Sequence, residues 1–129
     1  MKYLGIDFGL KNLGLAYAES PLSEPLTQYH YVFQDQALKF ISSIINQQHI
    51  DIIIIGLPEG KLANKVKNFA NKLKVKTNLP VYYQDETLST QEAKAKMIQA
   101  HLPQKKRRQD HSRAAAIILQ SYLDDHQKA

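Results

Sequence analysis

The chain of 129 residues contains no cysteine, and this absence excludes several kinds of chemistry. Without thiols there is no disulfide framework, no thiolate zinc site and no cysteine nucleophile. Long hydrophobic runs are also lacking, because the strongly apolar run at residues 52–55 is far too short to span a bilayer. Asp7 interrupts the apolar stretch at the start of the chain, which argues against a signal peptide. We therefore expect a cytoplasmic protein with no membrane partner.

No internal repeat, low-complexity segment or linker is visible, so we expect a single domain over residues 1–129. Apolar residues make up 43% of the sequence and charged residues 22%, as in ordinary globular proteins. The net charge of +5 favours a polyanionic partner, since bound Lys and Arg release counterions from a phosphate backbone. A basic surface that is merely solvated is the alternative.

Hydrophobic periodicity predicts a fold of the α/β class. Strands are expected at residues 2–7 and 13–18, paired as an antiparallel hairpin, at 27–33, at 51–58 and at 81–83. The β-branched run at 51–58 is typical of a central strand buried on both faces. Helices are expected near residues 37–45, 62–73 and 93–100, and from about 104 or 109 to 124, with Asp35 as a cap of the first. This order indicates a mixed sheet, with a leading meander, covered by helices.

Acidic residues stand where two of the expected strands end, which is where ligands bind in such sheets. Asp7 closes the first strand, and Asp85 and Glu86 follow the strand at 81–83. An alternative interpretation is structural. Asp7 would then accept hydrogen bonds from the backbone of its own turn, and either Asp85 or Glu86 would assist the cap of the following helix. Asp110 and His111 open the last helix, where an acidic residue is favourable by the helix dipole alone. Carboxylates suit Mg²⁺, and Mn²⁺ accepts imidazole more readily.

Basic residues gather in two segments of the sequence. Residues 60–80 contain six lysines, Lys61 among them, and no acid. Lys105, Lys106, Arg107 and Arg108 directly precede Asp110, and Arg113 follows it. Because the second run adjoins a candidate metal site, we expect it to contact phosphate, together with Lys11 and Lys61. A solvated charged surface remains the alternative.

Four segments of the chain resemble, in order, the motifs of the YqgF/RuvX family. They are residues 5–16, 55–58, 85–90 and 114–123, and they cover nearly the whole chain. The resemblance implies an RNase H-like mixed five-stranded sheet flanked by helices, kinship to Holliday-junction resolvases, and a role in maturing the 5′ end of 16S ribosomal RNA, hence in ribosome biogenesis.

The resemblance also implies the roles of individual residues. Asp7 would be the first metal ligand, and Glu86, with Asp85 beside it, the second acidic position. The family's third acidic position falls on His111, with an aspartate displaced to Asp110. Two positions where the family motifs have arginine are Asn12 and Thr87 here, and the loop after residues 55–58 is short.

The leading hypothesis is therefore a nuclease using Mg²⁺ or Mn²⁺, with Asp7, Glu86 and His111 as metal ligands and Asp85 and Asp110 as further catalytic candidates. Its substrate would be precursor ribosomal RNA or branched DNA, and the protein would act as a monomer or a weak homodimer. A non-catalytic nucleic-acid-binding module is the main alternative. An actin-like ATPase, suggested by residues 5–9 with Asn12, is disfavoured because that fold needs two such domains.

Overall fold

The strands form one mixed five-stranded sheet. The computed structural model describes residues 1–19, 21–85 and 111–127. The strands are β1 (Tyr3–Phe8), β2 (Asn12–Ala18), β3 (Glu24–His30), β4 (Ile52–Leu57) and β5 (Val81–Asp85). Their order is β3-β2-β1-β4-β5, with β1, β2 and β3 antiparallel and with β4 and β5 parallel to β1. The mixed sheet with a leading meander is thus confirmed.

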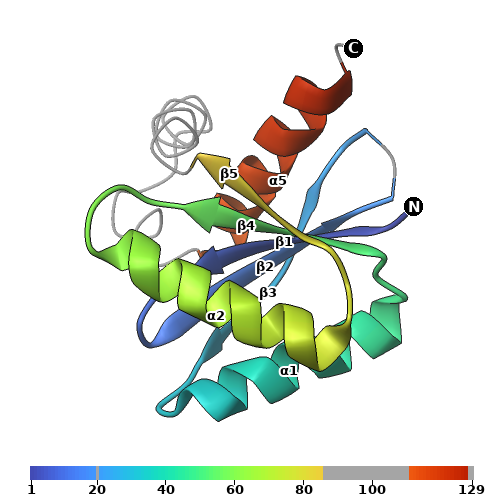
Figure 1. The fold of residues 1–129 in the computed structure, drawn as a ribbon. Helices are drawn as coiled ribbons and strands as arrows, with labels where there is room; N and C mark the ends of the chain where they lie inside the picture. Colours follow the sequence, from blue (N-terminus) through green and yellow to red (C-terminus); the bar gives the residue numbers. More distant parts are fainter. Residues whose placement is uncertain (20, 86–110, 128–129) are drawn as a thin grey trace.

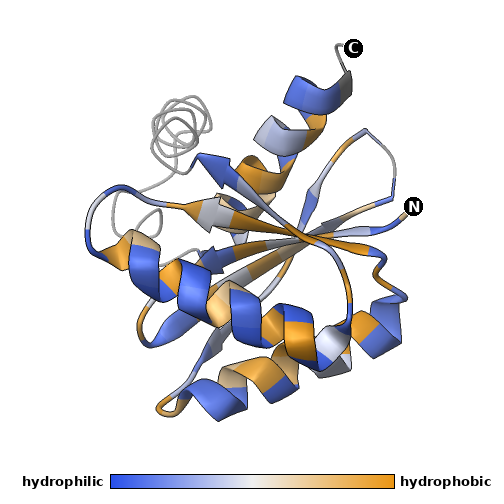
Figure 2. Cartoon of the chain, in the orientation of Figure 1, coloured by the Kyte–Doolittle hydropathy of each residue, from blue (hydrophilic) through white to orange (hydrophobic). Residues whose placement is uncertain are grey.

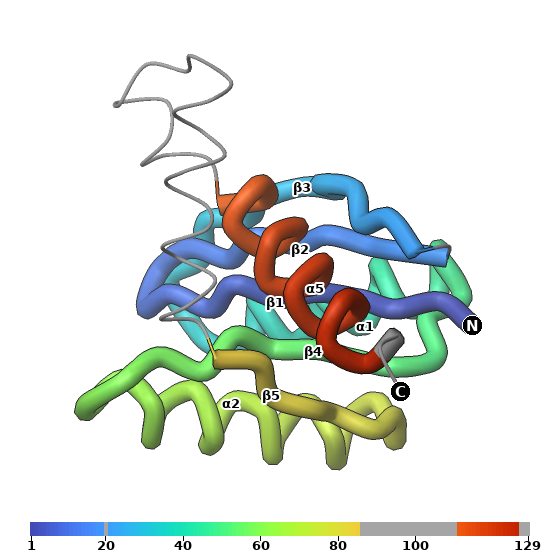
Figure 3. Tube along the Cα trace, turned by 90° about the horizontal axis from the view of Figure 1, so that it is seen from above, coloured from blue at the N-terminus to red at the C-terminus, as the bar shows by residue number. Residues whose placement is uncertain are grey.

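Helices cover both faces of this sheet. Helices α1 (Gln34–Gln48) and α2 (Leu62–Thr77) pack on one face, and α5 (His111–Gln127) crosses the other, as Figures 1 and 3 show. None of the helices in the described residues combines the length and the hydrophobicity that a membrane span requires. The helix expected at residues 93–100 lies outside the described part of the chain.

Hydrophobic residues form the centre of the sheet (Figure 2), and in β4 they are buried on both faces, as the β-branched run predicts. In β4, Ile53 and Ile55 belong to the core under α1 and α2, and Ile54 belongs to the core under α5. All three side chains are fully buried. Strand alternation places neighbouring residues on opposite faces, so a strand covered by helices on both sides must be apolar throughout.

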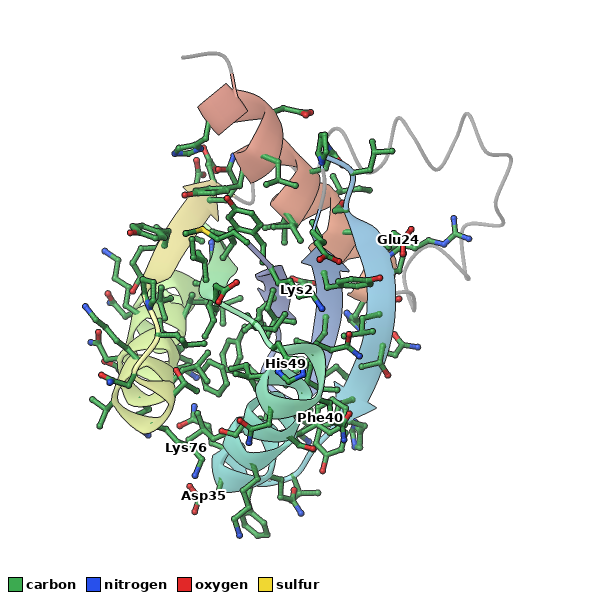
Figure 4. All side chains as sticks on the ribbon, turned by 90° about the vertical axis from the view of Figure 1, so that its right-hand side faces the viewer. Lys2, Glu24, Asp35, Phe40, His49 and Lys76 are labelled. Carbon is green, nitrogen blue, oxygen red and sulfur yellow. The ribbon has the colours of Figure 1, made fainter. Side chains whose placement is uncertain are left out.

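Aromatic rings fill the larger of the two cores, between the sheet and α1 and α2. Phe69 of α2 is fully buried and stacks on Phe8 of β1, with ring centroids 4.4 Å apart. Nearer the edge, Tyr29 of β3 stacks on Phe40 of α1, with ring centroids 4.2 Å apart; Figure 4 labels Phe40. These contacts fix both helices against the sheet.

The third strand lies earlier in the sequence than its periodicity predicts. β3 begins at Glu24 and ends at His30, whereas the alternation of apolar residues places it at 27–33 and leaves Pro25 in a loop. Pro25 is tolerated because β3 is an edge strand, where a missing N–H donor need not break a pair.

The cap of α1 also differs from the expectation. Asp35 lies in the first turn of the helix and does not cap it. Instead the side-chain oxygen of Gln36 accepts hydrogen bonds from the backbone N–H groups of Val32 and Phe33, at 2.9 and 3.0 Å. The longer glutamine side chain reaches back over the helix start, which satisfies donors that would otherwise be unpaired.

Candidate active site

Glycines allow α5 to lie against the backbone of the sheet. A Cβ atom on Gly14 of β2 would lie 1.8 Å from the backbone oxygen of His111, and one on Gly5 of β1 would lie 2.7 Å from Cβ of Leu119. Real side chains do not fit at such distances, because they overlap the atoms of the helix. The two glycines therefore set how closely α5 approaches.

Helix α5 runs diagonally across the strands, from β3 at its beginning to β5 at its end (Figure 3). The backbone N–H of His111 donates a hydrogen bond to Oε1 of Gln28 in β3, at 3.0 Å. Near the other end, Nε2 of Gln84 in β5 donates to Asp125 at 3.1 Å. The first turn of the helix is thereby fixed above β2 and beside the end of β1.

This placement brings His111 to Asp7. Asp7 alternates with Gly5 along β1, so both face α5. Nδ1 of His111 lies 3.7 Å from Oδ2 of Asp7, with 14% of the Asp7 side chain and 34% of the His111 side chain exposed. A carboxylate and an imidazole, far apart in sequence, thus share one partly enclosed site.

The turn after β1 does not use the Asp7 carboxylate. The turn is closed by its own backbone, where the N–H of Gly9 donates to the oxygen of Asn12 at 2.8 Å. Among the residues that the structure describes, His111 is the only polar partner of the Asp7 side chain. The geometry therefore contradicts the turn-capping alternative for Asp7 and pairs its carboxylate with the imidazole of His111.

The donor pair fits a divalent metal ion. Two atoms that each lie about 2.1 Å from one ion are at most about 4.2 Å apart, and the Asp7 and His111 atoms are 3.7 Å apart. Within residues 1–19, 21–85 and 111–127, no group of three acidic or histidine side chains comes together. The other expected donors, Glu86 and Asp110, lie outside the described residues.

Asp85 is the last residue of β5, so it belongs to the strand and does not follow it. Alternation places Asp85 on the same face as Val81, which packs in the core under α1 and α2. Gln84, its neighbour, points to the α5 side, where it contacts Asp125. Asp85 and Asp7 therefore lie on opposite faces of the sheet.

Two of the expected phosphate contacts lie at the same edge of the sheet as Asp7. Lys11 follows β1 and Lys61 follows β4, and both are exposed. Because β1 and β4 are parallel, their carboxyl ends meet at one edge. Arg113 is half-buried in the first turn of α5. The basic residues 105–108 lie outside the described part.

Tyr31, which the sequence did not single out, holds the turn beside Asp7 in place. Its hydroxyl donates a hydrogen bond to the backbone oxygen of Gly9. Its backbone N–H donates to the backbone oxygen of Lys11 at 2.9 Å. Burial raises the pKa of Tyr31 to about 12. Gln28, which fixes the start of α5, was missed as well, because both contacts depend on the folded arrangement of the meander.

The sheet order and the position of α5 define an RNase H-like fold. The chain is similar to a solved structure of T. thermophilus RuvC in complex with a Holliday junction substrate, with a TM-score of 0.66 at 17% identity, covering 98% of this chain and 96% of that one. The fowlpox virus Holliday junction resolvase matches with a TM-score of 0.60 at 12% identity, covering 97% and 99%. At such identities the likeness shows the fold alone.

Sequence comparison identifies the family. The family model "RuvX: Holliday junction resolvase" matches residues 1–125. The chain is 37% identical to a "Putative pre-16S rRNA nuclease" of Geobacillus kaustophilus (strain HTA426), over 96% of this chain and 98% of that protein. A protein of the same description from Protochlamydia amoebophila (strain UWE25) is 36% identical, over 95% and 93%. The chain belongs to the RuvX family, in agreement with the resemblance of its four motifs.

Proposed function

We propose that the protein is a divalent-metal-dependent nuclease that hydrolyses phosphodiester bonds in structured nucleic acid. The proposed substrates are the 5′ region of precursor 16S ribosomal RNA and Holliday-junction-like DNA, after the descriptions of the relatives and of the family model. The observation that carries the proposal is the meeting of Asp7 with His111, at an edge of the sheet that also bears Lys11 and Lys61.

Asp7 and His111 would hold the metal ion, with Glu86 as the further ligand that the family resemblance implies. A bound divalent ion lowers the pKa of its water and polarises the scissile phosphate. Gln28 fixes the first backbone N–H of α5 and so keeps His111 over the sheet. Lys11 and Lys61 would contact phosphates on either side, which positions the backbone without reading sequence.

The test is a cleavage assay with matched RNA and DNA versions of a hairpin and a four-way junction. Each is incubated with Mg²⁺, with Mn²⁺ or with EDTA. We expect cleavage with either metal and none with EDTA. Asp7→Asn should lower the rate by about 10²- to 10³-fold, the cost typical of losing one group that stabilises transition-state charge. It should bind nucleic acid almost as well as the wild type, because the lysines remain. Wild-type turnover by Asp7→Asn contradicts the assignment.

A non-catalytic nucleic-acid-binding module of the same fold is the second candidate. It is favoured by the histidine at position 111, where the family resemblance implies an aspartate. Binding of all four substrates with no cleavage under any metal would establish it. In that case His111→Asp is the informative variant, because gain of cleavage would show that a single ligand separates the two functions.

A further inference from the structure

A second polar pair lies beside the candidate active site, at the ends of β2 and β3. Nδ1 of His30 lies 3.0 Å from Oδ1 of Asn12, and the two residues are directly paired across the strands. A carboxamide oxygen only accepts, so the ring nitrogen Nδ1 carries the proton and donates it. The pair therefore holds the imidazole in one orientation and one tautomer.

The pair lies on the same face of the sheet as Asp7. Asp7 pairs with Gly14 in β2, and Gly14 pairs with Gln28 in β3, the residue that accepts from His111. Residues two apart on a strand share a face and are about 6.8 Å apart. Asn12 is two residues from Gly14 on β2, and His30 is two residues from Gln28 on β3, so both lie on the Asp7 face, next to the turn between β1 and β2.

Groups that donate to anions are available on this pair. Within the described residues, Nε2 of His30 and the amide nitrogen of Asn12 have no hydrogen-bond partner. His30 is exposed and Asn12 is half-buried, so a ligand can reach both. The Asn12 amide donates in every state, and Nε2 of His30 donates when the ring is protonated. Lys11, adjacent in the turn, adds a positive charge.

We propose that Asn12 and His30 form a phosphate subsite, which binds a phosphodiester group neighbouring the one held at Asp7 and His111. The proposal rests on the proposed function and adds to it a specific point where the nucleic-acid backbone is anchored. The competing role is structural, since a cross-strand side-chain pair can simply stabilise an edge strand. Binding measurements separate the two roles, because a structural pair affects the melting temperature and leaves the affinity unchanged.

The experiment measures binding at pH 5.5, where histidine side chains are generally protonated, and in EDTA, so that it does not depend on metal or on cleavage. A fluorescein-labelled DNA four-way junction and an RNA hairpin with a single-stranded 5′ leader are titrated with protein and followed by anisotropy. We expect His30→Ala and Asn12→Ala each to raise Kd by about tenfold, the loss expected for one hydrogen bond to a charged group. The control is His49→Asn, at the far end of α1 (Figure 4), which should bind like the wild type. In cleavage assays the two subsite variants should raise KM and leave kcat nearly unchanged.

A rescue variant guards against unfolding as the cause. Arginine binds phosphate through a planar fork, so Asn12→Arg in the His30→Ala background should restore affinity. It should also steepen the dependence of log Kd on log salt by about 0.9, the effect of one added phosphate contact. Wild-type affinity in both alanine variants, or no rescue by arginine, overturns the subsite. If the wild type binds neither nucleic acid, both the proposed function and the subsite are contradicted. If the wild type binds and cleaves, and the alanine variants bind with the same Kd, only the subsite is contradicted.

Discussion

Where α5 begins, the strands β1 and β2 present side chains of different sizes to the two faces of the sheet. The face under α1 and α2 carries large apolar residues, which are Leu4, Ile6, Phe8, Leu13, Leu15, Ile53 and Ile55. Towards α5, β1 presents Gly5 and Asp7 after Tyr3 at its start, and β2 presents Gly14, Ala16 and Ala18. Large side chains bury apolar area and hold the helices at a distance, whereas small ones let a helix backbone approach. The first face supplies stability, and the second positions His111 over Asp7.

The largest effect on stability should come from the face under α1 and α2. Phe69→Ala removes a fully buried ring that stacks on Phe8, so it should lower the free energy of unfolding by about 3–5 kcal/mol. Urea denaturation measures the loss. The control is Val75→Ala on the same helix, where the side chain is 85% exposed and the change should stay within about 0.5 kcal/mol. If the fraction of Phe69→Ala that remains folded has lost its cleavage activity, the division of roles between the faces is wrong.

The face under α5 should respond to added volume. Gly14→Ala forces the backbone of His111 away, because the new Cβ would lie 1.8 Å from its oxygen, and overpacking of this kind costs about 1–3 kcal/mol. Gly5→Ala is the matched variant, since it meets α5 at Ala115 and Leu119 instead. Both should lower the melting temperature, and Gly14→Ala should lose more cleavage activity than Gly5→Ala when both are assayed folded. Equal losses would mean that the start of α5 has no special role.

The smallest effect concerns Tyr31, which lies in the α1 and α2 core and also holds the turn after Asp7. Tyr31→Phe should cost about 1 kcal/mol near pH 8, the net value of one hydrogen bond. Burial raises the pKa of Tyr31 from 10.0 to about 12, so between these values the unfolded chain loses the proton while the folded chain keeps it. The protonated Tyr31 hydroxyl therefore stabilises the folded wild type fully only below pH 10. This stabilisation is lost as pH rises from about 10 towards 12.

The variant lacks this group, so the stability advantage of the wild type should shrink over that range. Urea titrations of both proteins at pH 8, 9.5, 10.5 and 11 measure it. A difference that stays constant with pH would show that the hydroxyl is not buried as described.

Local sequence patterns predicted most of the sheet. The isoleucines of β4 could be recognised as a buried strand because they lack alternation and are followed by Gly56 and Pro58. The position of β3 was wrong because Tyr31, buried beyond the end of the strand, continues its apolar alternation. Apolar alternation in the sequence indicates which residues are buried, and residues beyond the end of a strand can be buried as well.

Half of the candidate site could be inferred in the same way. Asp7 stands out at a strand end, and the family resemblance implies a third site position at His111. Gln28 could not be inferred, because it meets His111 across 83 residues of sequence. A usable indication was present in β2, where the small residues Gly14, Ala16 and Ala18 at every second position mark a face that a helix approaches closely. The roles of Glu86 and Asp110 stay predictions.

Asp7 and His111 share one metal ion in the proposed site, and Mn²⁺ binding in the absence of nucleic acid tests this arrangement without relying on cleavage. Free Mn²⁺ is followed by electron paramagnetic resonance during titration of the wild type, Asp7→Asn and His111→Ala, with His126→Ala near the other end of α5 as the control. Both site variants should weaken Mn²⁺ binding by at least about tenfold, whereas His126→Ala should bind like the wild type. Unchanged Mn²⁺ affinity in His111→Ala would contradict the shared metal site.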